Sequence, residues 1–365
     1  MMLKNVWLFL CLFYATEIWA QWNWHNPLDV KGTQVSYVHN QGWNEDGGNY
    51  RRLPMRAKQR IREAVWNLAG ESAGLAVRFK TDAENIKVRY QVTGGYSMPH
   101  MPSTGVSGVD LYRLSGKGSG EFCFGNYLFA DTVRYAYHID RMKAKGDVSE
   151  YVLYLPLYNG VKWLEVGVEK ENSFSFVPCS SDKKPLVLYG TSIAQGACAS
   201  RPGMAWGNIL SRSMNIPLVN LGFSGNGKLE KEVIDFISEQ EASVFILDCM
   251  ANLSGTAAKE VKELVKSAVY QLRAKHTAPI LLVEHAGYSN GVTNKAQYEA
   301  YTAPNREQRK AFDELKKENV KDVFYLSHDQ LGLHSDSWVD YVHPSDWGMV
   351  QQAVAVEKVL RKIMK

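Results

Sequence analysis

The stretch Leu186-Val-Leu-Tyr-Gly-Thr-Ser192 has the pattern of a buried strand that ends in a glycine turn and a serine. Further short apolar runs follow it and alternate with stretches of helical character. Continuous apolar strands between helices are typical of a parallel sheet that is covered on both faces. The expected strands are residues 185–189, 216–221, 244–247, 280–283 and 323–326, and the expected helices are 204–214, 229–238, 257–274, 297–318 and 349–364. The pattern therefore predicts an α/β domain at residues 185–365.

The residues before this domain have a different pattern, because many short strand-like segments follow one another without long helices between them. Residues 86–92 alternate between apolar and polar side chains, as a half-buried strand does. Asn159-Gly160 separates two apolar runs and is a strong signal for a β-hairpin. We therefore expect a β-sandwich at residues 21–178, joined by a polar linker at 179–184 to the α/β domain.

The composition is that of an ordinary globular protein, with 45% hydrophobic and 22% charged residues among 365. A chain of this length is expected to form two domains. The net charge of +4 is too small to indicate a nucleic acid or an anionic membrane as a partner. The 19 Tyr, 10 Trp and 13 Phe suit a β-rich domain and surfaces that face sugars.

The first 20 residues have the pattern of an export signal. Lys4 supplies a basic start, residues 6–14 form an apolar run too short to span a bilayer, and Ala20 offers a cleavage point. We therefore expect a signal peptide at 1–20 and export to the periplasm or the extracellular space. An uncleaved anchor or a lipoprotein is the alternative, but bulky residues precede Cys11 and fit a lipidation site poorly. No later stretch is long and apolar enough to predict a membrane span.

Four cysteines follow the expected signal: Cys123, Cys179, Cys198 and Cys249. In an oxidising compartment they could form disulfides in any of three pairings, which the sequence cannot separate. Buried free thiols are the equal alternative. No spacing of Cys and His in the sequence resembles a zinc site.

Three polar features follow the expected strands or precede the last helix, and ligands bind parallel sheets at the carboxyl ends of their strands. Ser192 follows the first strand at a glycine turn, which can expose a hydroxyl. Asp340-Tyr-Val-His343 precedes the last helix. A serine hydroxyl needs an imidazole to take its proton, and the imidazole needs a carboxylate to fix its tautomer. Taken alone, each feature is more often a plain turn or a helix cap.

Two loops could stabilise the negative oxygen that forms when a hydroxyl attacks an ester. Glycines at 222–227 follow the second strand and let backbone N–H groups approach a ligand, and the side-chain amide of Asn252 follows the third strand. A nucleotide-binding loop at 190–196 is the rival interpretation. Its glycine spacing matches neither nucleotide fingerprint, and no acidic residue closes the second strand.

Other polar and aromatic residues near the expected strand ends are candidates for substrate contact. Glu284, His285 and Tyr288 follow the fourth strand, and Trp338, like Trp347, flanks the His343 segment. A hydrogen-bonded loop and core packing are the alternatives for these residues. His285 could rival His343 as the base, and Asp336 could rival Asp340 as the orienting acid.

The order of these features closely resembles the SGNH (GDSL) hydrolase family over residues 185–365. The resemblance implies a flavodoxin-like three-layer α/β/α domain that needs no cofactor or metal. It implies Ser192 as the nucleophile, His343 as the base and Asp340 as its orienting acid. It assigns the oxyanion hole to the N–H groups of Ser192 and Gly225 and to the Asn252 side chain. Two motifs depart from the family pattern, since Gly-Thr-Ser replaces Gly-Asp-Ser and Met-Ala-Asn-Leu replaces Gly-x-Asn-Asp.

The first domain also carries a resemblance. Gly108-Val-Asp-Leu-Tyr112 is similar to the Gly-x-Asp-Leu-Tyr signature of a β-sandwich found before such hydrolases, and Tyr50-Arg-Arg-Leu-Pro54 and Ser72-Ala-Gly-Leu75 fit that pairing. A jelly-roll-like sandwich is expected, with Asp110 and Tyr112 in a structural role rather than in contact with substrate. Residues 96–107 form either a surface loop or a lid over the cleft.

The resemblance implies a secreted serine esterase that hydrolyses small acyl esters, with O-acetyl groups on carbohydrates as the expected substrates. An acyltransferase would use the same residues, and a catalytically silent carbohydrate-binding surface protein is a further alternative. A lipid esterase is disfavoured because the sequence has no long apolar lid. The sequence gives no indication of the oligomeric state.

Overall fold

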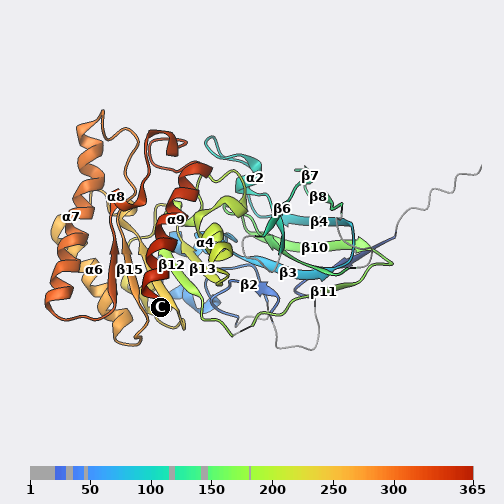
Figure 1. The fold of residues 1–365 in the computed structure, drawn as a ribbon, viewed down its shortest axis with the longest axis horizontal. Coiled ribbons are helices and arrows are strands. Elements are labelled where there is room, and N and C mark those ends of the chain that lie inside the picture. The colour runs from blue at the N-terminus through green and yellow to red at the C-terminus, as the bar shows by residue number, and fades with distance from the viewer. Residues whose placement is uncertain are drawn as a thin grey trace, which may run out of the picture.

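The computed structural model describes residues 21–29, 36–44, 48–114, 120–140, 147–180 and 182–364. Figure 1 shows a strand-rich part that carries the N-terminal half of the chain and a helix-rich part that carries the C-terminal half. The expected signal peptide at 1–20 lies outside the described residues. Among the helices described here, none combines the length and the apolar character that crossing a bilayer requires.

The N-terminal part contains two antiparallel sheets, with strand orders β1-β10-β4-β8-β7 and β11-β3-β9-β5-β6, and β2 pairs with β3. Buried side chains from both sheets pack into one core, as a β-rich domain requires. The alternation predicted for residues 86–92 is confirmed in β4, where every second residue is buried. The strands are β1 (Trp22–His25), β2 (Val38–His39), β3 (Ala76–Thr81), β4 (Asn85–Val92), β5 (Asp110–Leu114), β6 (Glu121–Cys123), β7 (Gly125–Leu128), β8 (Val133–His138), β9 (Ser149–Tyr154), β10 (Val161–Glu169) and β11 (Phe174–Phe176).

The predicted hairpin at Asn159-Gly160 is wrong. The strands on either side of it, β9 and β10, belong to different sheets, so the chain crosses from one sheet to the other at this turn. The reason lies in the buried Asn159 side chain, which accepts a hydrogen bond from Gly94 N (2.7 Å) and donates to Gly95 O (2.8 Å). These bonds hold the turn against the loop that follows β4, which belongs to the sheet that β10 joins.

The C-terminal part contains five parallel strands in the order β13-β12-β14-β15-β16, so the predicted parallel α/β pattern is confirmed. The strands are β12 (Leu186–Gly190), β13 (Leu218–Gly222), β14 (Val244–Asp248), β15 (Ile280–Val283) and β16 (Val323–Leu326). The α-helices of the C-terminal part are α3 (Ser192–Gln195), α4 (Trp206–Met214), α5 (Lys231–Ile237), α6 (Ala258–Arg273), α7 (Lys295–Lys317), α8 (His328–Leu331) and α9 (Asp346–Ile363), and its short 3-10 helices are η2 (Pro202–Met204), η3 (Met250–Asn252) and η4 (Ser335–Ser337). The N-terminal part contains α1 (Glu63–Leu68), α2 (Ser103–Val106) and the 3-10 helix η1 (Met55–Gln59).

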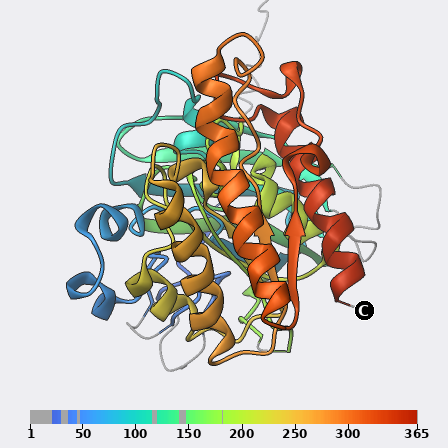
Figure 2. The ribbon, with the colours of Figure 1, turned by 90° about the vertical axis from the view of Figure 1, so that its left-hand side faces the viewer.

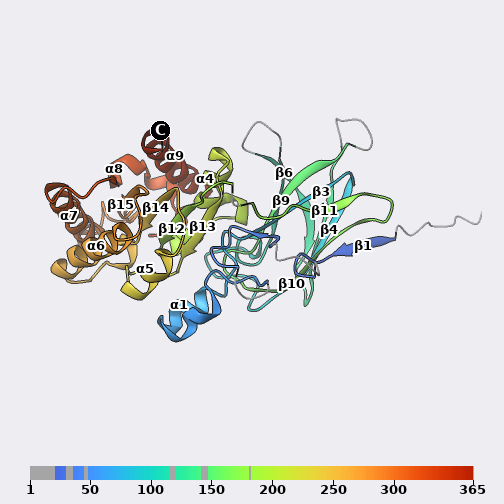
Figure 3. The ribbon, with the colours of Figure 1, turned by 90° about the horizontal axis from the view of Figure 1, so that it is seen from below.

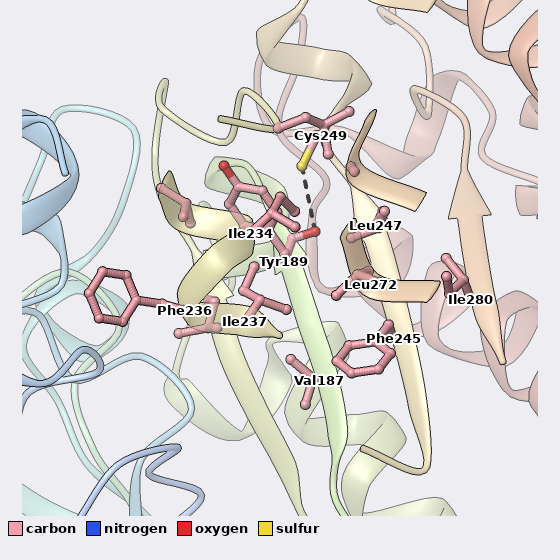
Figure 4. Packing of buried hydrophobic residues seen from close by; sticks show 14 of the residues in the cluster. Val187, Tyr189, Ile234, Phe236, Ile237, Phe245, Leu247, Cys249, Leu272 and Ile280 are labelled. Carbon is pink, nitrogen blue, oxygen red and sulfur yellow. Dashed lines mark hydrogen bonds between the residues drawn. The ribbon is translucent and has the colours of Figure 1, made fainter. Parts of the chain in front are cut away.

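Side chains that alternate along β12 enter two different apolar cores. Val187 and Tyr189 pack with residues of α5, α6 and α7, whereas Leu186 and Leu188 pack with residues of α4 and α9. Figure 4 shows the first of these cores, where the Cys249 thiol donates to the Tyr189 carbonyl at 3.7 Å. Figure 2 shows the same part from the side of α7, with α6 on one side of it and α9 on the other. Because β12 lies between these two cores, every one of its residues is buried.

One buried arginine joins the two parts of the chain. The Arg52 guanidinium donates to Leu68 O (2.7 Å) and Glu71 O (2.8 Å) and also to Gly222 O (2.5 Å) at the end of β13. Burial lowers the pKa of Arg52 to about 10, and the charge of Glu71 opposes the shift, so the group stays cationic at neutral pH. The segment that contains α1 thereby lies against the α/β part beside α5 (Figure 3).

Replacing this arginine is expected to destabilise the protein strongly. In Arg52→Met the side chain keeps its apolar stem, but the carbonyls of Glu71 and Gly222 lose the guanidinium donor, whereas Leu68 O still accepts Glu71 N at 3.0 Å. Each unsatisfied buried acceptor costs about 1–3 kcal/mol, so the loss should reach at least ~2 kcal/mol. The denaturant midpoint of unfolding measures this change.

The matched control is Arg306→Met, which removes an exposed ion pair with Glu299 on α7. Exposed pairs of this kind contribute at most about 1 kcal/mol. Equal midpoints for the Arg52 and Arg306 variants would contradict the role assigned to Arg52.

Candidate active site

Ser192 lies at the first position of α3, directly beyond the carboxyl end of β12. Thr191 precedes it, and its side chain accepts a hydrogen bond from Ile193 N and so caps the helix. Gly190 is required at the end of the strand, since a Cβ there would lie 2.5 Å from Ala194 Cβ and 2.8 Å from Asp248 O. The sharp turn from strand to helix places Ser192 at the functional edge of the sheet, where 7% of it stays exposed.

His343 connects Ser192 to Asp340 through two hydrogen bonds. The Nε2 atom of His343 lies 3.0 Å from Ser192 Oγ, and its Nδ1 lies 2.8 Å from Asp340 Oδ2. With the Nδ1 proton donated to Asp340, Nε2 carries the lone pair that can accept the Ser192 hydroxyl proton. Both distances are within the range at which a serine is activated as a nucleophile.

Asp340 is held in place by its own loop. Its Oδ1 atom accepts the backbone N–H groups of Val342 (2.8 Å) and His343 (2.7 Å). Partial burial pushes the pKa of Asp340 upward, but the hydrogen bonds from the His343 ring and from these two N–H groups outweigh it, so the pKa is lowered. The carboxylate therefore stays ionised and can stabilise a protonated His343.

The residues predicted for the oxyanion hole follow three neighbouring strands, β13, β12 and β14. These strands pair in register, with Gly190 opposite both Gly222 and Asp248, so their loops begin at the same level. Gly225 has a φ of +68°, which favours glycine, and a Cβ there would meet no atom within 4 Å, so its backbone borders open space. The Asn252 Oδ1 atom accepts Gly227 N at 2.9 Å, which leaves the Nδ2 protons free to face a ligand.

The two rivals for the acid and base roles have other contacts. His285 is fully buried, and its Nδ1 accepts Gly287 N at 2.9 Å. Burial, together with the charge of His328, lowers the pKa of His285 to about 3, so this imidazole stays neutral. The Asp336 side chain is 88% exposed, and its Oδ2 atom lies 3.9 Å from Nδ1 of His334. Asp340, and not Asp336, is the carboxylate beside the His343 ring.

The residues predicted to contact substrate divide into two groups. Glu284 and His285 lie beneath the surface, and Glu284 accepts hydrogen bonds from Tyr325 OH (2.5 Å) and His328 N (2.6 Å). Tyr288 and Trp338 lie beside the loop that carries His343: the Tyr288 ring is 5.4 Å from the Tyr341 ring, and Trp338 forms a β-bridge with Pro344. Trp347 is 55% exposed. A role of these residues in substrate binding stays a prediction.

The β-rich part also contributes a side chain to this site, which the sequence did not reveal. The ring of His100 is stacked on the ring of His343, with centroids 5.5 Å apart and planes 17° apart. His100 lies in the segment 96–107, which the Thr104 hydroxyl attaches to Ser200 O at 2.7 Å. The only signal in the sequence was the length and the Gly, Pro and Met content of this segment, and neither points to a particular residue.

The Gly-x-Asp-Leu-Tyr signature binds the loop that follows α3. Asp110 Oδ2 accepts Arg201 Nη1 at 2.6 Å and Gly203 N at 2.8 Å, and the same Arg201 nitrogen donates to Tyr112 OH at 2.6 Å. The side chain of Asp110 is 5% exposed. These contacts support the structural role predicted for both signature residues, because they fix the chain that leaves the Ser192 helix.

The cysteines of the described residues are all free thiols: Cys123, Cys179, Cys198 and Cys249. Of the two alternatives left open by the sequence, the structure has the free thiols. Burial raises the pKa of the Cys198 thiol to about 12, and the charge of Asp340 adds to the shift. This thiol is therefore protonated and is not a competing nucleophile.

Comparisons with known proteins give a family match for each part of the chain. Residues 183–361 match the GDSL-like Lipase/Acylhydrolase family, and residues 22–174 match the GxDLY model, the N-terminus of Esterase_SGNH_hydro-type. A protein from Bacteroides ovatus described as a GDSL-like lipase is 32% identical in sequence, with a TM-score of 0.83 over 94% of this chain and 98% of that chain. The chain belongs to the GDSL-like (SGNH) hydrolase family, and this membership supports an ester-hydrolysing enzyme.

Two more distant structures share the fold. The salicylyl-acyltransferase SsfX3 from a tetracycline biosynthetic pathway is 19% identical, with a TM-score of 0.72 over 93% of this chain and 97% of that chain. A family two carbohydrate esterase from Cellvibrio japonicus is 14% identical, with a TM-score of 0.58 over 94% of this chain and 98% of that chain. No match was found among curated proteins.

A buried carboxyl beside the site predicts an unusual pH dependence of stability. Asp248 is 5% exposed, and Gln352 Nε2 donates to it at 3.1 Å. Burial raises the pKa of Asp248 to about 7. An unfolded Asp titrates near ~3.9, so the folded state binds the proton more tightly and loses stability as the pH rises from about 4 to 7.

Asp248→Asn should remove this loss. Between pH 5 and pH 8 the wild type should lose about 2–3 kcal/mol relative to the variant, measured from denaturant midpoints at both pH values. The control is the exposed Asp182→Asn, which should follow the wild type. Parallel behaviour of wild type and Asp248→Asn across this range would contradict a protonated Asp248.

Proposed function

We propose that this chain is a serine esterase that forms an acyl-enzyme on Ser192. The observation that carries the proposal is the continuous hydrogen-bond chain from Ser192 Oγ through His343 to Asp340. Membership of the GDSL-like hydrolase family supports the same reaction class. The sequence departs from the family motifs at Thr191 and Leu253. Neither position carries one of the proposed roles, so the nucleophile, the base, the orienting acid and the oxyanion donors are all present.

The proposed reaction has two steps. Ser192 Oγ attacks the ester carbonyl while His343 Nε2 takes its proton, and Asp340 stabilises the imidazolium that results. The N–H groups of Ser192 and Gly225 and the Asn252 amide donate to the oxyanion. His343 then protonates the departing alcohol, and a water molecule activated by His343 hydrolyses the acyl-enzyme.

We propose O-acetyl groups on carbohydrates as the substrates of this site. A carbohydrate esterase shares the fold, and exposed aromatic side chains on the β-rich part, Phe122, Phe124 and Tyr127, offer faces on which sugars can stack. Export, suggested by the residues before position 21, would bring the protein to such polymers. Acetate release from a panel of acetylated polysaccharides tests this assignment, and turnover of aryl acetates without any polysaccharide would contradict it.

An acyltransferase is the second candidate, because an acyltransferase shares the fold over nearly the whole chain. The same residues would pass the acyl group to an alcohol instead of to water. Incubating the enzyme with an aryl acetate and a sugar distinguishes the two, since an esterase accumulates acetate and a transferase accumulates a sugar ester. The complete set of Ser192, His343 and Asp340 argues against a catalytically silent binding protein.

We also propose that the chain is organised as a jelly-roll-like sandwich at 21–178, a linker at 179–184 and a flavodoxin-like three-layer domain at 185–365.

Ser192→Ala is expected to abolish ester hydrolysis. Without the hydroxyl no acyl-enzyme can form, and kcat for an aryl acetate should fall by at least ~10⁴-fold. Initial rates with purified protein measure the change. The matched control is Ser213→Ala on α4, whose hydroxyl contacts Leu210 O and Glu357, and it should keep the wild-type rate. Undiminished turnover by a pure Ser192→Ala sample would rule out the serine mechanism.

Two substitutions of Asn252 distinguish its proposed role in stabilising the oxyanion from its role in holding the Gly227 loop. Asn252→Asp keeps the oxygen that accepts Gly227 N but loses the Nδ2 donor, so kcat should fall by about 10²–10³-fold with little change in KM. Asn252→Ala removes both contacts and should fall at least as far. If Asn252→Asp retained the wild-type kcat, the residue would serve only to hold the Gly227 loop.

A further inference from the structure

Four side chains around the catalytic imidazole form a cluster of metal-ligating groups. They are His100, Cys198, Asp340 and His343, and one ligand atom from each lies within 4.8 Å of the others. They come from three separate segments: the loop of the β-rich part that covers the site, the turn after α3, and the loop before α9. Two of them are the base and the orienting acid of the proposed reaction.

The donor set suits one ion in particular. Imidazole nitrogen, thiolate sulfur and carboxylate oxygen are the groups that bind Zn²⁺, and four of them complete a tetrahedral site. In such a site neighbouring donor atoms are roughly 3.3–3.8 Å apart, as follows from bond lengths of about 2.0–2.3 Å. The widest separations in the cluster exceed this spacing by up to about 1 Å, whereas His343 Nδ1 and Asp340 Oδ2, at 2.8 Å, are closer than it. Binding therefore needs side-chain shifts of about 1 Å, which side chains in loops can make.

The positions of Cys198 and His100 fit this use. Cys198 is 5% exposed, and its Sγ atom lies 3.3 Å from His100 O, so the thiol is held against the segment that carries the His100 ring. His100 itself is exposed and stacks on His343, so an ion can enter from its side. Neither residue has an assigned part in ester hydrolysis.

We propose that these four residues bind Zn²⁺ and that the bound ion reversibly inhibits the enzyme. The Cys198 S–H proton passes to solvent as the zinc–sulfur bond forms, and no electron is transferred. The ion is an inhibitor and not a cofactor, because it binds the groups that activate Ser192.

Inhibition follows whichever nitrogen of His343 binds the ion. Zinc on Nε2 occupies the lone pair that must accept the Ser192 proton. Zinc on Nδ1 displaces the proton donated to Asp340, and the ring then carries its proton on Nε2, where it can no longer accept one. In both cases Ser192 loses its base.

The test measures binding and inhibition separately on the full chain, because the inhibition rests on the proposed function and the binding does not. Calorimetric titration with ZnCl₂ gives the affinity and stoichiometry, and titration with CoCl₂ reports a thiolate-to-metal charge-transfer band. The variants are Cys198→Ala, His100→Gln, Ser192→Ala and the control Cys123→Ala, which removes a thiol outside the cluster. Rates with an aryl acetate are measured for the wild type and for every variant except Ser192→Ala, and each is expressed relative to the zinc-free rate of the same protein.

We expect one Zn²⁺ per chain in the wild type, in Ser192→Ala and in Cys123→Ala. In the wild type and in Cys123→Ala, turnover should be lost on zinc addition and restored by EDTA, whereas Ser192→Ala reports binding alone. Cys198→Ala should lose the cobalt band, and both ligand variants should bind Zn²⁺ at least ~10-fold more weakly and resist inhibition correspondingly. If Cys198→Ala does not fold, the exposed His100→Gln still decides the matter.

Absent binding in the wild type, or unchanged affinity and inhibition in both ligand variants, would overturn the zinc site. A wild type that binds zinc in the expected pattern but shows no turnover without it would refute the esterase and leave the binding site standing.

Discussion

The hydrogen bond between Ser192 Oγ and His343 Nε2 is the contact on which the proposed chemistry depends. A serine hydroxyl is a weak nucleophile, and it gains reactivity only when an imidazole of the correct tautomer lies within reach. Here the parts are 151 residues apart in the chain and meet at 3.0 Å. The parallel sheet makes this possible, because it brings the end of β12 and the loop before α9 to one edge.

The β-rich part stabilises the loops of this edge at several points. Arg52 binds the end of β13, and Asp110 binds Arg201 in the chain that leaves α3. His100 covers the ring of His343. The β-rich part therefore contacts the chain near each of three functional groups. Arg52 does so near the loop of Gly225, Asp110 near Ser192, and His100 at His343 itself. Because the two parts of the chain are in contact here, the Cys198 thiol and the His100 imidazole lie beside His343.

The sequence predicted those features that depend on local pattern. Continuous apolar runs predicted the five parallel strands, and the Asp-x-x-His spacing predicted the contact between Asp340 and His343, since three residues of a turn fix that distance. Asn159-Gly160 does not form the hairpin that its sequence predicts, because long-range hydrogen bonds of the Asn159 side chain hold the turn where the chain passes to the other sheet. His100 and Cys198 gave no signal for the same reason: their closeness to the site exists only in the folded chain.

The most direct test of the central claim compares the rate at which a fluorophosphonate labels Ser192 in the wild type and in His343→Gln. Mass spectrometry of the peptide that contains Ser192 reports site and rate together. We expect labelling at Ser192 in the wild type and a rate lower by at least ~10³-fold in the variant, because the hydroxyl loses its base. Equal rates in the two proteins, or labelling at another residue, would contradict it.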